Sequence, residues 1–339
     1  MPKVNKSLLF AKITEKLQFL GLNRDERDAT IRSWEYAQLS EKFSHGFDRL
    51  SWLMEMVQLG KVVPNTGLVV EKNKLVHKIK GNKSLGYFAA EKAVDEVIKL
   101  GKKNGIGFVT IQDCYPTGCM GQYTEAITKA NLIGLAITHS PPKVAPYGST
   151  EAIFSTSGHS IGFPSNDIPY IYDASTAATT NGKILMLNKL KKKIPKEHVL
   201  TQNGTFTKNP SDVVDERGLF IGVITSAGGK HAHKFSGLTG ALELLAGLAL
   251  LNNRQEKANS YSIFMAINPA LFGNIDHYRS LITQLQVTIN NSKPLKGFRK
   301  VYFAGQQSHL KRQKNKAKDS IFVSEDTCNL LFPERKVYG

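Results

Sequence analysis

The sequence predicts a mixed α/β protein with two lobes and a helical segment at its N-terminus. The chain has 339 residues, which favours two packed lobes or one large α/β unit over a single small domain. Hydrophobic residues make up 41% of the chain, enough for a sizeable core. The first 60 residues show only helical spacing, whereas strand-like and helix-like patterns alternate after residue 67.

The first 60 residues are expected to form three helices. The second should run from Asn23 to Ala37, and the third from about Arg49 to Leu59, where Gly60 follows as a stop signal. The first is marked by apolar residues at helical spacing and by the glycine that follows them: Leu8, Leu9, Ile13, Leu17, Leu20 and Gly21.

Beyond a break at residues 64–67, strands and helices are expected to alternate. No clean βαβ dinucleotide unit appears among them. The expected elements are a strand, turn and strand in 68–81, a helix at 85–101, a strand at 106–112, a helix at 121–131, a strand at 132–138, strands near 160 and 170, an apolar helix at 235–251, a strand and turn at 264–273, a helix at 276–290 and a last strand at 300–305. We therefore divide the chain into a helical N-terminal segment (1–67), a mixed α/β core (68–310) and a basic C-terminal tail (311–339).

Composition argues against several classes of protein. No run approaches 18 apolar residues, so no membrane span is expected, and the basic N-terminus lacks the features of a signal peptide. The cysteines form an odd and sparse set, which argues against a disulfide framework and for free thiols in a reducing cytoplasm: Cys114, Cys119 and Cys328.

The formal charge of +17 is the strongest anomaly in the composition. A basic surface attracts phosphate groups, including those of nucleic acid, anionic membranes and phosphorylated cofactors. The two densest basic clusters, residues 189–196 and 311–318, contain no interleaved aromatic residue of the kind found in grooves that bind single strands. We interpret them as solvated faces, so nucleic acid is not the expected partner.

Four polar clusters at expected element junctions are candidate sites. Residues 44–49 contain a histidine able to exchange protons near neutral pH and an arginine able to clamp a carboxylate, although a helix cap with an incidental histidine is the alternative. Residues 172–176 place an acid before small hydroxyl residues, which suits an anionic ligand, a histidine-orienting Asp or a simple turn. Residues 228–234 combine glycines, lysines and a helix start, as a phosphate site does, and 304–306 follow the last expected strand.

Metal and nucleotide motifs are otherwise absent. No GxGxxG follows a strand, and neither GxxxxGK[ST] nor HExxH occurs. His231 and His233 form an HxH, but without nearby acids or thiols no metal site is expected.

These clusters, in this order, resemble the malate/L-lactate dehydrogenase family that lacks the Rossmann fold. Its relatives include ureidoglycolate and sulfolactate dehydrogenases and diketogulonate and piperideine-carboxylate reductases. The family pattern SHGxxRLxxY…GxxxP is similar to SHGFDRLSWLMEMVQLGKVVP, and TNSxPxVAPxGG is similar to THSPPKVAPYGS at 138–149. Further similarities are IGFP, YDASTA, Gly182-Lys183, Lys234 before ALELLAG, and residues 304–306 in place of the family's PGE.

The resemblance implies a two-lobed, non-Rossmann NAD(P)-binding fold, commonly in a homodimer, with NAD or NADP in a cleft between the lobes. It implies that His45 donates the proton, and that Ser44 and Asp173 relay this proton or orient the imidazole. The implied contacts of a small carboxylate substrate are Arg49, Thr156 and His139. The implied cofactor contacts are Gly118, Cys119, Met120, Gly121, Ser175, Thr176, His233, Lys234 and Gly305.

Departures from the family pattern leave alternatives open. Pro116 stands where some members have a proton-accepting histidine, and proline cannot move a proton. Either His45 alone carries the chemistry, or the chain is a catalytically silent relative that binds a nucleotide or an anionic partner. If Asp173 contacts His45, it should raise the pKa of the imidazole and favour reduction near neutral pH. His139, where the family has Asn, and His159 are the alternative proton donors.

Overall fold

The computed structural model describes residues 1–251 and 260–333, and the chain divides between two compact units. The described residues of unit 1 are Met1–Ala136, Ser160–Asp173 and 264–333. Those of unit 2 are Ile137–His159, 174–251 and 260–263. Each unit therefore combines stretches that are far apart in the sequence.

The N-terminal part of unit 1 is a cluster of helices, as the spacing predicts. Helices α1 (Lys6–Phe19), α2 (Arg24–Leu39) and α3 (Arg49–Gln58) match the three expected helices. Their shared core also receives residues from α10 (Glu325–Leu331) near the other end of the chain. The fully buried side chains at its centre include Leu9, Ile13, Leu17, Trp34, Phe47, Leu50 and Leu53.

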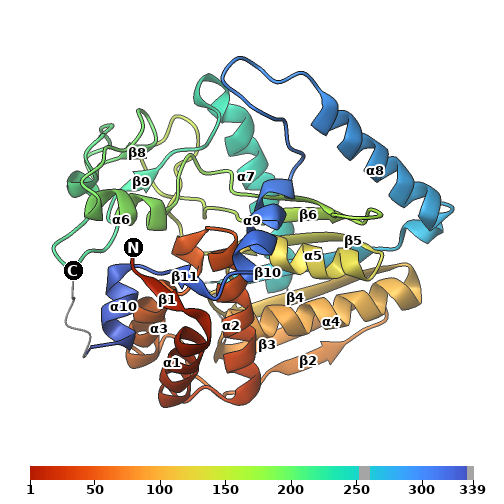
Figure 1. Cartoon of the computed structure of the whole chain (residues 1–339), viewed down its shortest axis with the longest axis horizontal. Coiled ribbons are helices and arrows are strands. Elements are labelled where there is room, and N and C mark those ends of the chain that lie inside the picture. The colour runs from red at the N-terminus through yellow and green to blue at the C-terminus, as the bar shows by residue number, and fades with distance from the viewer. Residues whose placement is uncertain (252–259, 334–339) are drawn as a thin grey trace. The chain divides into compact units, whose positions relative to one another are not determined.

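Two short strands bring the ends of the chain together within unit 1. Strand β1 (Lys3–Asn5) pairs antiparallel with β11 (Ser320–Phe322), and the two lie side by side in Figure 1. The Asp48 carboxylate, just before α3, accepts a hydrogen bond from the Thr327 hydroxyl at 2.9 Å. The described part of the basic segment after residue 310 thus contains the end of α9 (Gln306–Lys316), β11 and α10.

A seven-stranded mixed sheet has the strand order β2-β3-β4-β10-β5-β6-β7. β2 pairs antiparallel with β3, whereas β3 pairs parallel with β4. Helices α4 (Gly86–Asn104) and α5 (Gly121–Lys129) share a hydrophobic core with these strands. The strands are β2 (Val69–Lys72), β3 (Val76–Ser84), β4 (Ile106–Cys114), β5 (Ile133–His139), β6 (His159–Phe163), β7 (Tyr170–Ala174) and β10 (Tyr261–Ile267).

The predicted mixed α/β class is confirmed, but one predicted strand is wrong. Residues 300–305 form no strand; a turn at Ala304 and Gly305 leads directly into α9. Gly305 has a left-handed backbone conformation (φ +87°), which ends any extended run. The Ala304 carbonyl accepts one hydrogen bond from the Ile171 N–H at 3.2 Å. Helix α8 (Ile275–Asn291) matches the helix expected just before this segment.

Unit 2 has a smaller core around two short strands and helix α6 (Asn181–Lys189). β8 (Val199–Leu200) pairs antiparallel with β9 (Val223–Ile224). Helix α7 (Ala232–Ala246) is the expected apolar helix, whereas α6 (Asn181–Lys189) was not expected from the sequence. The Thr180 side chain caps α6 by accepting from the N–H of Lys183. No helix in the described parts of the chain is both long enough and apolar enough to cross a membrane.

Candidate functional site

His45 lies in a short 3-10 helix (Phe43–His45) between α2 and α3, in unit 1. Gly46 allows this turn to pack closely, because a Cβ there would collide with the Gln38 side chain. The Nδ1 atom of His45 is buried and finds no hydrogen-bond partner in the described part of the chain. A buried nitrogen without a partner is uncommon in folded proteins, which makes this imidazole a candidate for contact with a substrate.

Burial lowers the pKa of His45 to about 4, and the nearby positive charge of Arg49 adds to this effect. Asp173 acts in the opposite direction but is outweighed. The expectation that Asp173 raises this pKa above its ordinary value is therefore wrong. The physical reason is that desolvation dominates and that the Asp173 carboxylate is engaged by Lys42. The imidazole of His45 is neutral near pH 7.

Arg49 begins α3 and presents a cation that has no carboxylate within ion-pair distance in the described residues. Its Nε atom is buried and lacks a hydrogen-bond partner there as well. The guanidinium carbon lies 5.1 Å from the centre of the Trp52 ring. The geometry leaves the guanidinium able to receive a carboxylate in the two-point fashion typical of arginine.

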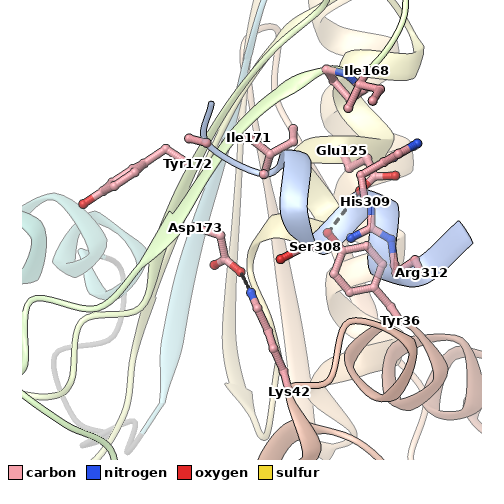
Figure 2. Close-up of a pocket in the computed structure, with 13 residues that line it drawn as sticks. Tyr36, Lys42, Glu125, Ile168, Ile171, Tyr172, Asp173, Ser308, His309 and Arg312 are labelled. Atoms are coloured by element: carbon pink, nitrogen blue, oxygen red, sulfur yellow. Dashed lines mark hydrogen bonds and ion pairs between the residues drawn. The ribbon is translucent and has the colours of Figure 1, made fainter. Parts of the chain in front are cut away.

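Asp173, at the end of β7, lines a cavity of about 270 Å³ that lies within unit 1. The Lys42 ammonium donates to its carboxylate at 2.6 Å, and Figure 2 shows the two side chains pointing at each other. Burial alone would lower the pKa of Lys42, but Asp173 reverses this and raises it. The cavity lining consists of Tyr36, Lys42, Glu125, Ile168, Pro169, Ile171, Tyr172, Asp173, Ala304, Gly305, Ser308, His309 and Arg312.

A second ion pair lines the same cavity. Arg312, on α9, donates to Glu125 of α5 at 2.5 Å, and the Tyr36 hydroxyl donates to the same carboxylate at 3.1 Å (Figure 2). The Arg312 guanidinium also lies 4.2 Å from the centre of the Tyr36 ring. This cluster fixes α9, which begins just after Gly305 and presents Ser308 and His309 to the cavity.

The glycine-rich turn at residues 118–121 reaches Asp173 as well. Gly118 has a left-handed backbone (φ +74°), and a Cβ added at Gly121 would lie 3.0 Å from the Asp173 side chain. Cys119 and Met120 between them are buried. Burial raises the pKa of the Cys119 thiol to about 12, so this cysteine is no nucleophile near neutral pH.

In unit 2, His139 is held by a partly buried carboxylate. Its Nδ1 contacts the Glu243 side chain, and its ring stacks on Tyr261 with 4.2 Å between ring centres. Glu243 also accepts hydrogen bonds from the Ser155 N–H at 2.8 Å and from the Ser157 hydroxyl at 2.9 Å. Burial opposes ionisation of Glu243, but the contacts with His139 and Ser155 outweigh it and lower the pKa of this carboxyl group.

The remaining expected site residues of unit 2 lie on two segments. The Ser175 hydroxyl donates to the Thr156 carbonyl, so these two residues are in contact. Thr176 is buried and accepts from the Thr239 hydroxyl at 2.7 Å. The other two, His233 and Lys234, are exposed in the first turn of α7.

The structure thus brings together, within unit 1, the expected residues Asp173, Gly121 and Gly305, with His45 near Asp173. Four residues around the cavity had no recognisable signal in the sequence: Tyr36, Lys42, Glu125 and Arg312. A GxSxG sequence at 158–162 is no nucleophile elbow, because Ser160 is fully buried in β6 and bonded to Thr124. No cluster of metal-ligating side chains occurs in residues 1–251 and 260–333.

Comparison with known proteins gives a consistent result over most of the chain. The sequence model of the family described as malate/L-lactate dehydrogenase matches residues 4–331. The chain is 27% identical to L-sulfolactate dehydrogenase of Methanocaldococcus jannaschii, covering 94% of this chain and 92% of that protein. It is 28% identical to Delta(1)-pyrroline-2-carboxylate reductase of Ancylobacter novellus, covering 75% of each. The crystal structure of the M. jannaschii enzyme superposes with a TM-score of 0.84 at 26% identity, covering 98% of this chain and 96% of that one.

Proposed function

Because the chain belongs to the malate/L-lactate dehydrogenase family, we propose that it transfers a hydride between NAD or NADP and a small 2-hydroxy, 2-oxo or 2-imino acid. The observation that carries this proposal is the state of His45 and Arg49. Each has a buried nitrogen without a hydrogen-bond partner in the described residues, and they are four positions apart. The His45 imidazole can exchange a proton and the Arg49 guanidinium can bind a carboxylate, and hydride transfer to or from such an acid requires both.

The residues of unit 1 fit a nicotinamide nucleotide. The cavity offers apolar side chains for a ring and carboxylates that can accept from sugar hydroxyls. Asp173 and Gly305 line this cavity, and Gly121 packs against the Asp173 side chain. When bound, the cofactor supplies or accepts the hydride at C4 of its nicotinamide. From unit 2, we propose Ser175, Thr176, His233 and Lys234 as further contacts of the cofactor.

The protein's own residues supply orientation and the proton. Arg49 holds the substrate carboxylate, and Thr156 and His139 are proposed as further substrate contacts. When a 2-hydroxy acid is oxidised, the hydride leaves carbon 2 and the hydroxyl proton passes to the neutral imidazole of His45. In reduction the imidazole must first be protonated, which its pKa of about 4 makes costly in the free protein. The low pKa of His45 therefore contradicts the expectation that reduction is favoured near neutral pH.

The residues that surround His45 are proposed to position it. Ser44 precedes it in the same short helix, and Asp173 offsets part of the desolvation. In this scheme the N-terminal segment 1–67 supplies the proton-transfer motif and the core 68–310 binds the cofactor.

Single-turnover hydride transfer in histidine variants tests the role of His45. His45→Asn should abolish transfer while leaving cofactor affinity within about twofold, because general acid–base groups contribute roughly 10²–10⁴-fold to rate. His139→Asn and His159→Asn test the two alternative proton donors, of which the former contacts Glu243 and the latter contacts the Ser157 carbonyl. Near-wild-type transfer in His45→Asn, with loss in His139→Asn, would refute the assignment.

A catalytically silent relative that binds a nucleotide or an anionic partner is the second candidate. The observation that favours it is Pro116, which occupies the place of a proton-accepting histidine of some family members. Oxidation of NADH or NADPH with a panel of 2-oxo acids separates the two candidates. Cofactor binding without turnover of any acid would select the silent relative.

We also propose that the protein is a cytoplasmic homodimer. Helix α7 and the 3-10 turn after it expose three large apolar side chains, Leu244 (79%), Leu248 (43%) and Leu251 (72%). The three buried free cysteines suit a reducing compartment. Light scattering should give a dimer for the wild-type protein and a monomer for Leu244→Lys.

A further inference from the structure

The Arg49 guanidinium borders on the ring of Trp52, which in turn meets a second aromatic ring from another element. Trp52 follows it by three residues on α3, with its ring centre 5.1 Å from the guanidinium carbon. Tyr115, just after β4, meets Trp52 edge to face at 5.4 Å between ring centres. Both rings are only partly buried. An anion held by Arg49 would therefore have aromatic surface beside it.

The charged side chains around Arg49 leave one positive charge for one anionic group. The neighbouring cations are already paired, since Lys42 binds Asp173 and Arg312 binds Glu125. His45 is neutral near pH 7 because burial lowers its pKa to about 4. Within the described residues of unit 1 that interact with His45, Arg49 alone is a cation without an acidic partner. One substrate carboxylate satisfies it, and a second would be desolvated against Trp52 and Tyr115 without compensation.

We infer that Trp52 and Tyr115 are specificity-determining residues that pack against the substrate side chain, and that the preferred substrate is a monocarboxylic 2-oxo or cyclic 2-imino acid with an apolar or aromatic side chain. This inference rests on the proposed function, because it places the substrate carboxylate on Arg49. Aromatic rings offer a large apolar surface and favourable edge-to-face contacts to such a side chain. They offer no positive charge to the second carboxylate of a dicarboxylic acid.

The kinetic test compares phenylpyruvate with oxaloacetate, each with NADH and NADPH. The wild-type protein should have a kcat/KM at least about tenfold higher for phenylpyruvate, in the range that apolar pockets achieve. Trp52→Ala and Tyr115→Ala should each lower this preference by about tenfold, mainly by raising KM for phenylpyruvate. Trp52→Phe, which keeps an aromatic ring, should retain most of the preference. Phe19→Ala, which removes an 84% exposed ring elsewhere in unit 1, is the matched control and should keep the wild-type preference. A preference for oxaloacetate, or equal losses for both acids, would overturn the inference.

A fluorescence test does not depend on turnover. The chain contains two tryptophans, Trp34 and Trp52, and Trp34 is fully buried. Phenylacetate should change the emission of the wild-type protein, whereas succinate should not, and the response should vanish in Trp52→Phe and weaken in Arg49→Lys. If phenylacetate gives this response but no acid is turned over, the substrate class stands and the proposed catalytic function fails. If 2-oxo acids are turned over but phenylacetate causes no change at Trp52, the substrate class fails and the function stands.

Discussion

Replacing His45 with asparagine should make the protein less sensitive to acid. Burial lowers the pKa of His45 from 6.5 to about 4, so the unfolded chain takes up a proton that the folded protein does not. Stability is therefore fully present above the unfolded pKa and is lost as the pH falls below it. Each pKa unit corresponds to about 1.4 kcal/mol. Linkage then predicts that His45 lowers the free energy of unfolding by roughly 2.5 kcal/mol at about pH 4.5, and by almost nothing at about pH 7.5.

Urea unfolding of the wild type and of His45→Asn at these two pH values measures the difference. The wild type should lose roughly 2.5 kcal/mol more than the variant on acidification. All other titratable groups are common to both proteins, so their contributions cancel. The variant's stability at about pH 7.5 serves as the control for any loss of packing. An identical loss in both proteins would show that His45 is not buried as a neutral imidazole, and the assignment of His45 as a base near neutral pH would fall with it.

Three further outcomes are expected. Arg49→Lys should raise KM for a 2-oxo acid by at least about tenfold at saturating cofactor, because lysine cannot form a planar two-point clamp; an unchanged KM removes Arg49 from the substrate site. Lys234→Ala should reduce the increase in melting temperature caused by NADH or NADPH, and equal increases in both proteins would contradict its role at the cofactor. Gly305→Ala should destabilise the protein by about 1–3 kcal/mol in urea unfolding, because φ is +87° and a Cβ would lie 2.9 Å from the Ile171 carbonyl oxygen; wild-type stability would show that the turn relaxes.

Periodicity predicted most of the fold because long elements have a clear apolar pattern. Helix α4 and strand β4 lie where the spacing places them. Short elements carry too few residues for a pattern, which explains why β1 and β11 were not predicted. Residues 300–305 have the composition of a strand, but a glycine with positive φ and the absence of a pairing ladder prevent one.

Side chains that are close in the sequence could be predicted as a group, and distant ones could not. His45 and Arg49 were recognisable because one short motif contains both. Lys42 meets Asp173 across 131 positions, and Arg312 meets its acidic partner across 187. No local pattern distinguishes these lysines and arginines from the many others in a chain of charge +17. The direction of the His45 pKa shift depends on burial, which the sequence does not display.

The pairing of β1 with β11 has a consequence for synthesis of the protein. The first helices leave the ribosome early, but their core is incomplete without Ile321, Val323 and Leu331. The core of the N-terminal segment (1–67) is therefore completed only after residues beyond 320 have been made, because its last contacts join residues far apart in the sequence. Until then its apolar helices are exposed to chaperones and to aggregation. A ribosome stalled before residue 320 should display an N-terminal segment that proteases still cleave.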